Sequence, residues 1–117
     1  MNELIMRILK DFKVNGEIIP VNFLFYEGHD EPYITFFKLS EQGSYSGDDK
    51  LQGWVDYYDF DVYSKGNYES IIESLTQVLI ENEFMLQPSK CSQDFYETDT
   101  GYYHRTLCFA IFKQKEV

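Results

Sequence analysis

The stretch from Leu51 to Tyr63 reads LQGWVDYYDFDVY, and its side chains alternate in character as they do along an extended strand. Successive side chains of a β-strand point to opposite faces of a sheet, so every second residue shares a face. One face would carry Trp54, Tyr58, Phe60 and Val62, and the other would carry Val55, Tyr57, Asp59, Asp61 and Tyr63. The stretch therefore predicts a long strand with one core-facing side and one side of carboxylates and tyrosines.

Two helices are expected, one before the first three strands and one after them. Apolar residues recur at helical spacing over residues 2–13, and Asn15-Gly16 is expected to end this first helix. A second apolar stripe predicts a helix that begins after an Asn67 cap and reaches about Asn82. Both helices are amphipathic, so each needs an apolar surface to cover.

Further strands complete the expected sheet. Alternating or aromatic runs predict strands at residues 18–26, 33–39 and 102–113, with short ones at 84–87 and 94–98. Asp99, Thr100 and Gly101, preceded by a threonine, predict the hairpin turn that opens the last strand. The order α-β-β-β-α-β-β predicts a single α+β domain over residues 1–117, with a mostly antiparallel sheet of four to five strands and two helices packed on one face.

Residues 40–50 interrupt the strand pattern. They read SEQGSYSGDDK, with two glycines, three serines and no aliphatic residue. Glycine, serine and aspartate favour turns and loops over regular strands. The composition predicts a mobile acidic loop at about 40–50.

The chain is strongly acidic. Its 117 residues carry 10 Lys and Arg against 20 Asp and Glu, a formal net charge of −10. Such a charge repels phosphate backbones and anionic lipid surfaces, so it argues against nucleic-acid binding and peripheral membrane binding. We also expect neither a secretory signal nor a membrane span, because no apolar run approaches the roughly 18–20 residues that a span needs.

The charge is unevenly distributed along the chain. Residues 27–63 hold nine carboxylates against two lysines, whereas residues 1–13 hold Arg7, Lys10 and Lys13 against two carboxylates. Opposite charges at two places on one chain favour head-to-tail association of like subunits.

The motifs that could carry chemistry are weak. Asp99-Thr100-Gly101 spells the aspartic-protease triplet but lacks the apolar strand that buries such a dyad, so a plain turn is favoured. His104 and Cys108 lie four apart on a strand, about 13 Å, which is too far for one zinc ion. Cys91 and Cys108 are expected as reduced thiols. We therefore predict no catalytic, cofactor-binding or metal-binding residues.

Two segments carry a resemblance to a known family. Residues 57–68 read YYDFDVYSKGNY, and residues 94–105 read DFYETDTGYYHR. Together they resemble small tail-completion proteins, also called tail-terminator or head-to-tail joining proteins, of long-tailed phages and prophages of Gram-positive bacteria. The resemblance spans roughly residues 55–113.

The resemblance implies a structural protein rather than an enzyme, with no cofactor. It implies a homo-oligomeric ring, usually a hexamer, made in the bacterial host cytoplasm and placed at the head-proximal end of the virion tail. The ring would cap the tail-tube protein, join it to the head-connector protein and let genomic DNA pass without specific binding.

We expect two groups of residues to serve such a ring. An acidic channel would not bind phosphate, so the candidates to line it or to face a neighbouring subunit are Glu41, Asp48, Asp49, Asp56, Asp59 and Asp61. The candidates for a basic partner face are Arg7, Lys10 and Lys13. The alternative is a small acidic inhibitor or DNA mimic that binds a basic partner. An acid protease is a third class, which only the Asp99 triplet supports.

Overall fold

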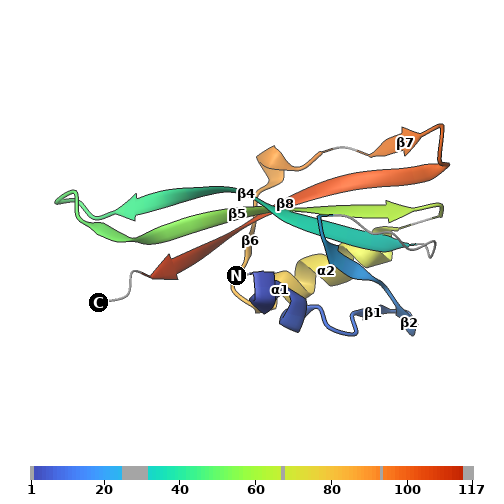
Figure 1. Cartoon of the computed structure of the whole chain (residues 1–117), viewed down its shortest axis with the longest axis horizontal. Helices are drawn as coiled ribbons and strands as arrows, with labels where there is room; N and C mark the ends of the chain where they lie inside the picture. The colour runs from blue at the N-terminus through green and yellow to red at the C-terminus, as the bar shows by residue number, and fades with distance from the viewer. Residues whose placement is uncertain (1, 25–31, 67, 93, 115–117) are drawn as a thin grey trace.

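The computed structural model describes residues 2–24, 32–66, 68–92 and 94–114, and these residues form an α+β fold (Figure 1). The helices are α1 (Asn2–Ile8), α2 (Glu69–Glu81) and the short 3-10 helix η1 (Pro88–Lys90). The strands are β1 (Lys13–Val14), β2 (Glu17–Ile18), β3 (Val21–Phe23), β4 (Tyr33–Tyr45), β5 (Leu51–Ser64), β6 (Met85–Leu86), β7 (Phe95–Glu97) and β8 (Tyr102–Gln114).

The main sheet is built around β5. Its order is β3-β4-β5-β8-β6, with β7 also paired to β8, so it has six strands rather than the expected four to five. All of its pairings are antiparallel except that of β3 with β4, which is parallel. The predicted class, an α+β fold with a mostly antiparallel sheet, is confirmed.

The core lies between one face of the sheet and the two helices, which Figure 1 shows on the same side of the sheet. Phe36, Phe60 and Phe109 come from three adjacent strands, are fully buried, and place their ring centroids 5.7 Å apart in two successive pairs. Ile5 of α1 and Leu75 of α2 are fully buried in the same cluster. Burial of such side chains stabilises the fold by about 1.5–3 kcal/mol each. We call this side the inner face and the opposite side the outer face.

The first helix is shorter than the periodicity predicts. It ends at Ile8, and the chain then passes through Asp11 in the left-handed region, at φ 55°. Asn15 and Gly16 have φ values of 54° and 80°, which suit the two central positions of a type I′ hairpin turn, here between β1 and β2. The expectation that Asn15-Gly16 ends the helix was therefore wrong. Phe12 is nevertheless buried, so the apolar pattern marked core positions correctly.

The predicted loop at residues 40–50 is mostly strand. β4 continues to Tyr45 and stays paired with β5, with Glu41 opposite Asp56 and Gly43 opposite Trp54. The register shifts between Lys38 and Ser40 and again between Ser44 and Tyr45. Only residues 46–50 form the turn, which a hydrogen bond from Ser46 N to Lys50 O closes at 2.9 Å. Polar residues with low strand propensity become strand here because the β-forming sequence of β5 pairs with them.

The β4–β5 hairpin and the end of β8 extend beyond the helices (Figure 1). We call residues 40–57 and 110–114 the arm. The fold measures 51 × 27 × 23 Å along its principal axes, and the arm accounts for one end of the long axis. In the described part of the chain, neither α1 nor α2 packs on this end of the sheet.

The predicted strand over residues 18–26 is divided: Ile18 ends β2, which pairs with β1 in a separate two-stranded sheet, and β3 covers only Val21–Phe23. The remaining boundaries follow the sequence closely. The second helix runs from Glu69 to Glu81, and the expected Asn67 cap lies outside the described residues, as do residues 25–26 of the first predicted strand. The predicted turn is confirmed: Gly101 N donates to Glu97 O at 2.8 Å, and Gly101 has a φ of 78°. A glycine adopts this left-handed backbone without strain.

The arm depends on a close approach of two strands at Gly53. A Cβ at this position would lie 2.2 Å from the carbonyl oxygen of Lys113 and 2.8 Å from the ring of Phe112. We expect Gly53→Ala to lower the free energy of unfolding by about 1–3 kcal/mol, as overpacking does. Gly47→Ala is the matched control, because its Cβ would meet nothing within 4 Å. Urea unfolding of both variants measures the difference, and equal stabilities would contradict the close approach.

Candidate functional site

The outer face carries a row of aromatic rings. Tyr33, Tyr63, His104 and Phe95 stand opposite one another across β4, β5, β8 and β7. The ring centroids of Tyr33 and Tyr63 are 4.7 Å apart, those of Tyr63 and His104 are 4.4 Å apart, and both pairs are stacked. Burial raises the pKa of Tyr63 to about 12, with a further contribution from Asp61. The Tyr63 phenol therefore stays neutral at ordinary pH.

Asp61 makes polar contacts with His104 and Thr106 of β8. Its Oδ1 lies 3.1 Å from Nε2 of His104 and accepts a hydrogen bond from the Thr106 hydroxyl at 2.5 Å. The Asp61 side chain is largely buried, with 15% of its surface exposed. Most of this carboxylate is therefore buried and bonded within its own sheet, so little of its surface is exposed to line a channel.

Asp59 lies two residues before Asp61 on β5 and stands opposite Cys108 of β8. Burial raises the pKa of Asp59, and burial together with the Asp59 carboxylate raises the pKa of Cys108 to about 11. Because only the thiolate is a strong nucleophile, Cys108 is inert at neutral pH. Both cysteines are free, and Sγ of Cys91 accepts a hydrogen bond from the Cys108 N–H at 3.4 Å.

Asp56 points to the inner face, and its grouping with Asp59 and Asp61 was wrong. It is fully buried, and its Oδ2 lies 2.9 Å from Nζ of Lys113 and 3.5 Å from Nζ of Lys38. The reason is strand alternation, because position 56 shares a face with Tyr58 and Phe60. A carboxylate buried between two lysines of its own chain does not line a channel.

The other three acidic candidates lie on the arm. Glu41 is exposed and pairs with Lys38 at 3.0 Å. Asp48 and Asp49 are exposed in the turn at the tip, where Asp48 pairs with Lys50 at 3.8 Å and accepts a hydrogen bond from the Ser46 hydroxyl. The six predicted carboxylates thus do not form one continuous surface: Asp59 and Asp61 lie on the outer face, the buried Asp56 stands opposite Glu41, and Asp48 and Asp49 lie at the tip of the arm.

The basic candidates form an exposed strip. Arg7 lies on α1, Lys10 in the following turn and Lys13 on β1, and all three are exposed. Among the described residues, none of them has a carboxylate within 4.0 Å. We call these three residues the basic strip.

Asp99 and Thr100 are exposed in the β7–β8 turn, where the Thr100 hydroxyl donates to Glu97 at 3.3 Å. The prediction of a structural turn therefore holds. In the parts of the chain that the structure describes, no three His, Cys, Asp or Glu side chains are grouped as a metal site. No described helix is long and apolar enough to cross a membrane.

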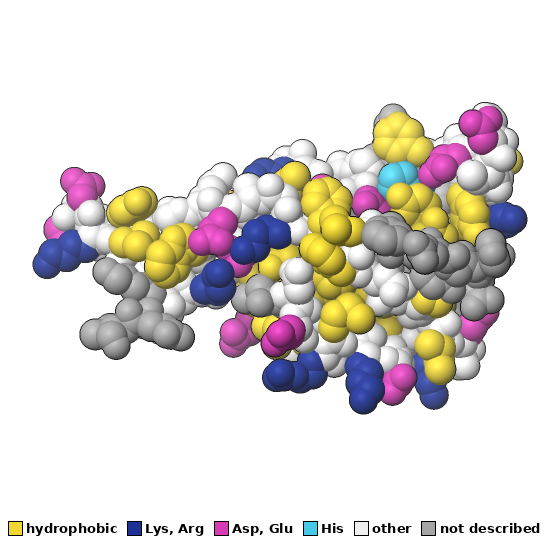
Figure 2. Space-filling view, viewed as in Figure 1, with side chains coloured by type: hydrophobic (Ala, Val, Ile, Leu, Met, Phe, Trp, Pro, Cys, Tyr) yellow, Lys and Arg dark blue, Asp and Glu magenta, His cyan; other side chains and the backbone are white. Residues whose placement is uncertain are grey.

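An aromatic notch beside β7 was not predicted. Gly66, Tyr68, Asp94 and Tyr103 line a hollow of about 310 Å³. The buried Tyr68 hydroxyl donates a hydrogen bond to Asp94, and the ring of Tyr96 lies 4.9 Å from that of Tyr103. Tyr96 and Tyr103 are 55% and 42% exposed, and hydrophobic and acidic side chains gather at this end of the molecule (Figure 2). The feature of the sequence that could have predicted this notch is the number of tyrosines over residues 96–103.

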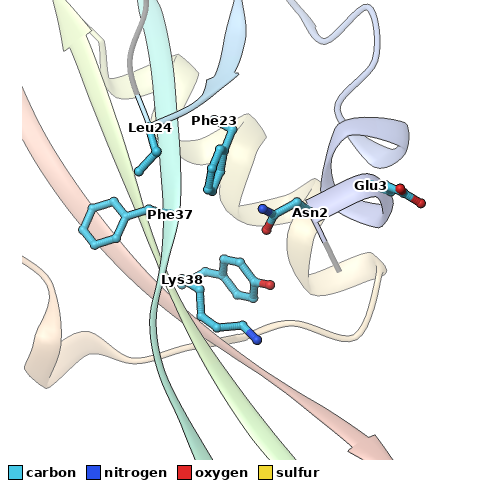
Figure 3. Close-up of a pocket in the computed structure, with 7 residues that line it drawn as sticks. Asn2, Glu3, Phe23, Leu24, Phe37 and Lys38 are labelled. Atoms are coloured by element: carbon cyan, nitrogen blue, oxygen red, sulfur yellow. The ribbon is translucent and has the colours of Figure 1, made fainter.

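A second hollow of about 610 Å³ lies between α1, the end of β3 and the edge of β4 (Figure 3). It is lined by Asn2, Glu3, Phe23, Leu24, Phe37, Lys38 and Tyr58. The Tyr58 hydroxyl is buried there, with no hydrogen-bond partner among the described residues. The hollow offers one cation, one carboxylate and apolar walls, which is a binding surface rather than a catalytic constellation.

No family model matches the chain, and no curated protein matches it.

The ion pairs of Asp56 should stabilise the protein more than the pair at the arm tip. Lys113→Met leaves the buried carboxylate with Lys38 alone, and we expect a loss of about 1–3 kcal/mol in unfolding free energy. The loss stays below that of a fully buried pair because Lys113 reaches solvent. Lys50→Met, at a lysine 82% exposed, should cost less than about 0.5 kcal/mol. Chemical denaturation measures both, and a Lys113 variant no weaker than the control would contradict the assignment.

Asp59 should make stability depend on pH. Its folded pKa lies above the unfolded value of 3.8, so its contribution to stability falls as pH rises through the folded pKa. We expect Asp59→Asn to raise the melting temperature at pH 7 and to lose this advantage as the pH approaches 4.

Asp48→Asn is the control for the pH experiment. The hydrogen bond from Ser46 lowers the pKa of Asp48, so removing this carboxylate should weaken the fold at pH 7. Thermal melts from pH 4 to pH 7 measure both variants. An Asp59→Asn variant less stable than the parent at pH 7 would refute the assignment.

Proposed function

We propose that this protein is a ring-forming tail-completion protein of a long-tailed phage or prophage. In this proposal the ring caps the tail tube, joins it to the head connector and lets genomic DNA pass without specific binding. The role of the protein is structural: it contacts its own copies and the tail-tube and head-connector proteins.

The observation that carries the proposal is how the two segments of the resemblance meet. Residues 57–68 and 94–105 are far apart in sequence, yet Tyr63 stands opposite His104 and Tyr68 bonds to Asp94. The resemblance therefore falls on one contiguous part of the molecule, the aromatic row and the aromatic notch, rather than on two unrelated turns. Shared sequence in one packed unit supports a shared structural role.

The shape and charge of the fold also support an assembly role. The arm extends beyond the core, and beyond Phe36 and Ala110 the outer edges of β4 and β8 pair with no other strand among the described residues. Unpaired edges and exposed aromatic side chains are surfaces that other chains cover in assemblies. The basic strip and the acidic arm lie on different parts of one chain, as head-to-tail contacts require.

Fewer of the six predicted carboxylates remain as candidates to line the channel. Asp56 is excluded by burial, and Asp61 is bonded to His104 and Thr106. The exposed carboxylates at the arm are Glu41, Asp48 and Asp49, and in our proposal these line the channel or face a neighbouring subunit. Carboxylates there would keep the DNA phosphates from adhering.

The mass of the assembly tests the proposal. Sedimentation velocity over a concentration series, at two salt concentrations, should show a hexamer or a monomer that converts to a salt-sensitive ring. Negative-stain images of that species should show a central opening. Binding to purified tail tubes from the same phage should cap one end only.

A monomer at every concentration that also fails to bind tail tubes would contradict the proposal. The acidic-inhibitor alternative would then be favoured, because it requires a monomer or dimer that holds a basic partner.

A further inference from the structure

The aromatic notch has the composition of a site for a cationic side chain. Tyr103 is 42% exposed and lines the hollow, the exposed Tyr96 ring packs against it, and Asp94 supplies an exposed carboxylate at the same hollow. Aromatic faces attract Lys and Arg through their negative π-surface, and a carboxylate beside them adds a direct ion pair. The hollow of about 310 Å³ has room for one such side chain.

The chain already uses this chemistry elsewhere. Nζ of Lys90 lies 3.9 Å from the ring centroid of Tyr57, and Nζ of Lys65 lies 5.2 Å from that of Tyr102. Among the described residues, no lysine or arginine lies over Tyr96 or Tyr103. These two rings are therefore available to a cation from another molecule.

The basic strip supplies the matching cations. Arg7, Lys10 and Lys13 are exposed, and among the described residues they have no carboxylate partner. The whole chain has a net charge of −10, whereas residues 1–13 hold three basic residues against two acidic ones. Asp94, an exposed carboxylate that lines the notch, has the opposite charge to the strip.

The two surfaces are separate on the molecule. Figure 1 shows α1 and β1 at the lower side of the view and β7 at its upper edge. One copy therefore cannot fill its own notch with its own strip, whereas a second copy can. A contact between two different patches is heterologous, and repeating it gives a closed ring when the rotation closes.

We propose that the aromatic notch of one copy binds the basic strip of the next copy, with a Lys or Arg side chain in the hollow against the ring of Tyr103 and paired to Asp94. This contact rests on the proposed function, because it is the subunit contact of the proposed ring. It names the surfaces and the partner chemistry that the ring proposal leaves open.

Two variants test the contact from its two sides. The notch variant carries Tyr96→Ala and Tyr103→Ala, and the strip variant carries Arg7→Glu, Lys10→Glu and Lys13→Glu. All five positions are exposed, so each variant should fold, and circular dichroism checks this. We expect each variant alone to associate at least about tenfold more weakly than the parent, which corresponds to about 1.4 kcal/mol.

Mixing the two variants gives the sharper result. Each retains one intact half of the contact, so an equimolar mixture should form a dimer of about twice the 13.9 kDa chain mass but no ring. Ile80→Ala and Glu81→Lys, at exposed positions near the end of α2 and outside the notch, the strip and the arm, are the control variants and should assemble as the parent does.

The outcomes separate this inference from the proposed function. If both variants form rings like the parent, or if the mixture stays monomeric while the parent forms rings, the contact is overturned and the ring proposal stands. If the parent is a monomer at every concentration, the contact is overturned too. Tail-tube binding then decides the proposed function by itself.

Discussion

The fold depends on a single strand that is hydrogen-bonded along both edges. β5 pairs with β4 from Tyr63 to Leu51 and with β8 from Ser64 to Gly53. Because a central strand satisfies its backbone groups on both sides, it can remain regular over 14 residues. Its first half builds the arm and its second half carries the core on one face and the aromatic row on the other. The arm and the aromatic row are both built on it.

Asp56 marks the boundary between the core and the arm. On the inner face, Tyr58, Phe60 and Val62 are fully buried in the core region, and the next inward position is a carboxylate. A buried charge is costly unless it is paired, and Lys38 from β4 and Lys113 from β8 supply the pairing. One carboxylate thus ties the three strands of the arm together where the helices end.

The sequence predicted the elements whose side chains meet the core, because hydrophobic periodicity reports burial directly. The faces of β5 and the helix α2 are examples. The exposed turn at Gly101 was predicted from its turn-forming residues instead. Prediction failed at residues 40–45, where strand formation comes from pairing with β5 and not from local propensity. It also misplaced Asp56, since residue type suggested solvent while parity along the strand pointed inward. The aromatic notch joins Tyr68 to Asp94 and Tyr103, a long-range contact that no local pattern encodes.

Amide hydrogen exchange of the free protein, measured residue by residue, tests this account most directly. It predicts continuous protection along β5 from Gly53 to Tyr63, because each of its N–H groups bonds to one neighbour or the other. It predicts protection at every second residue of β4 beyond Phe36, where only one edge is paired. Protection that ends at Tyr58, with residues 40–57 exchanging as freely as an open loop, would contradict it.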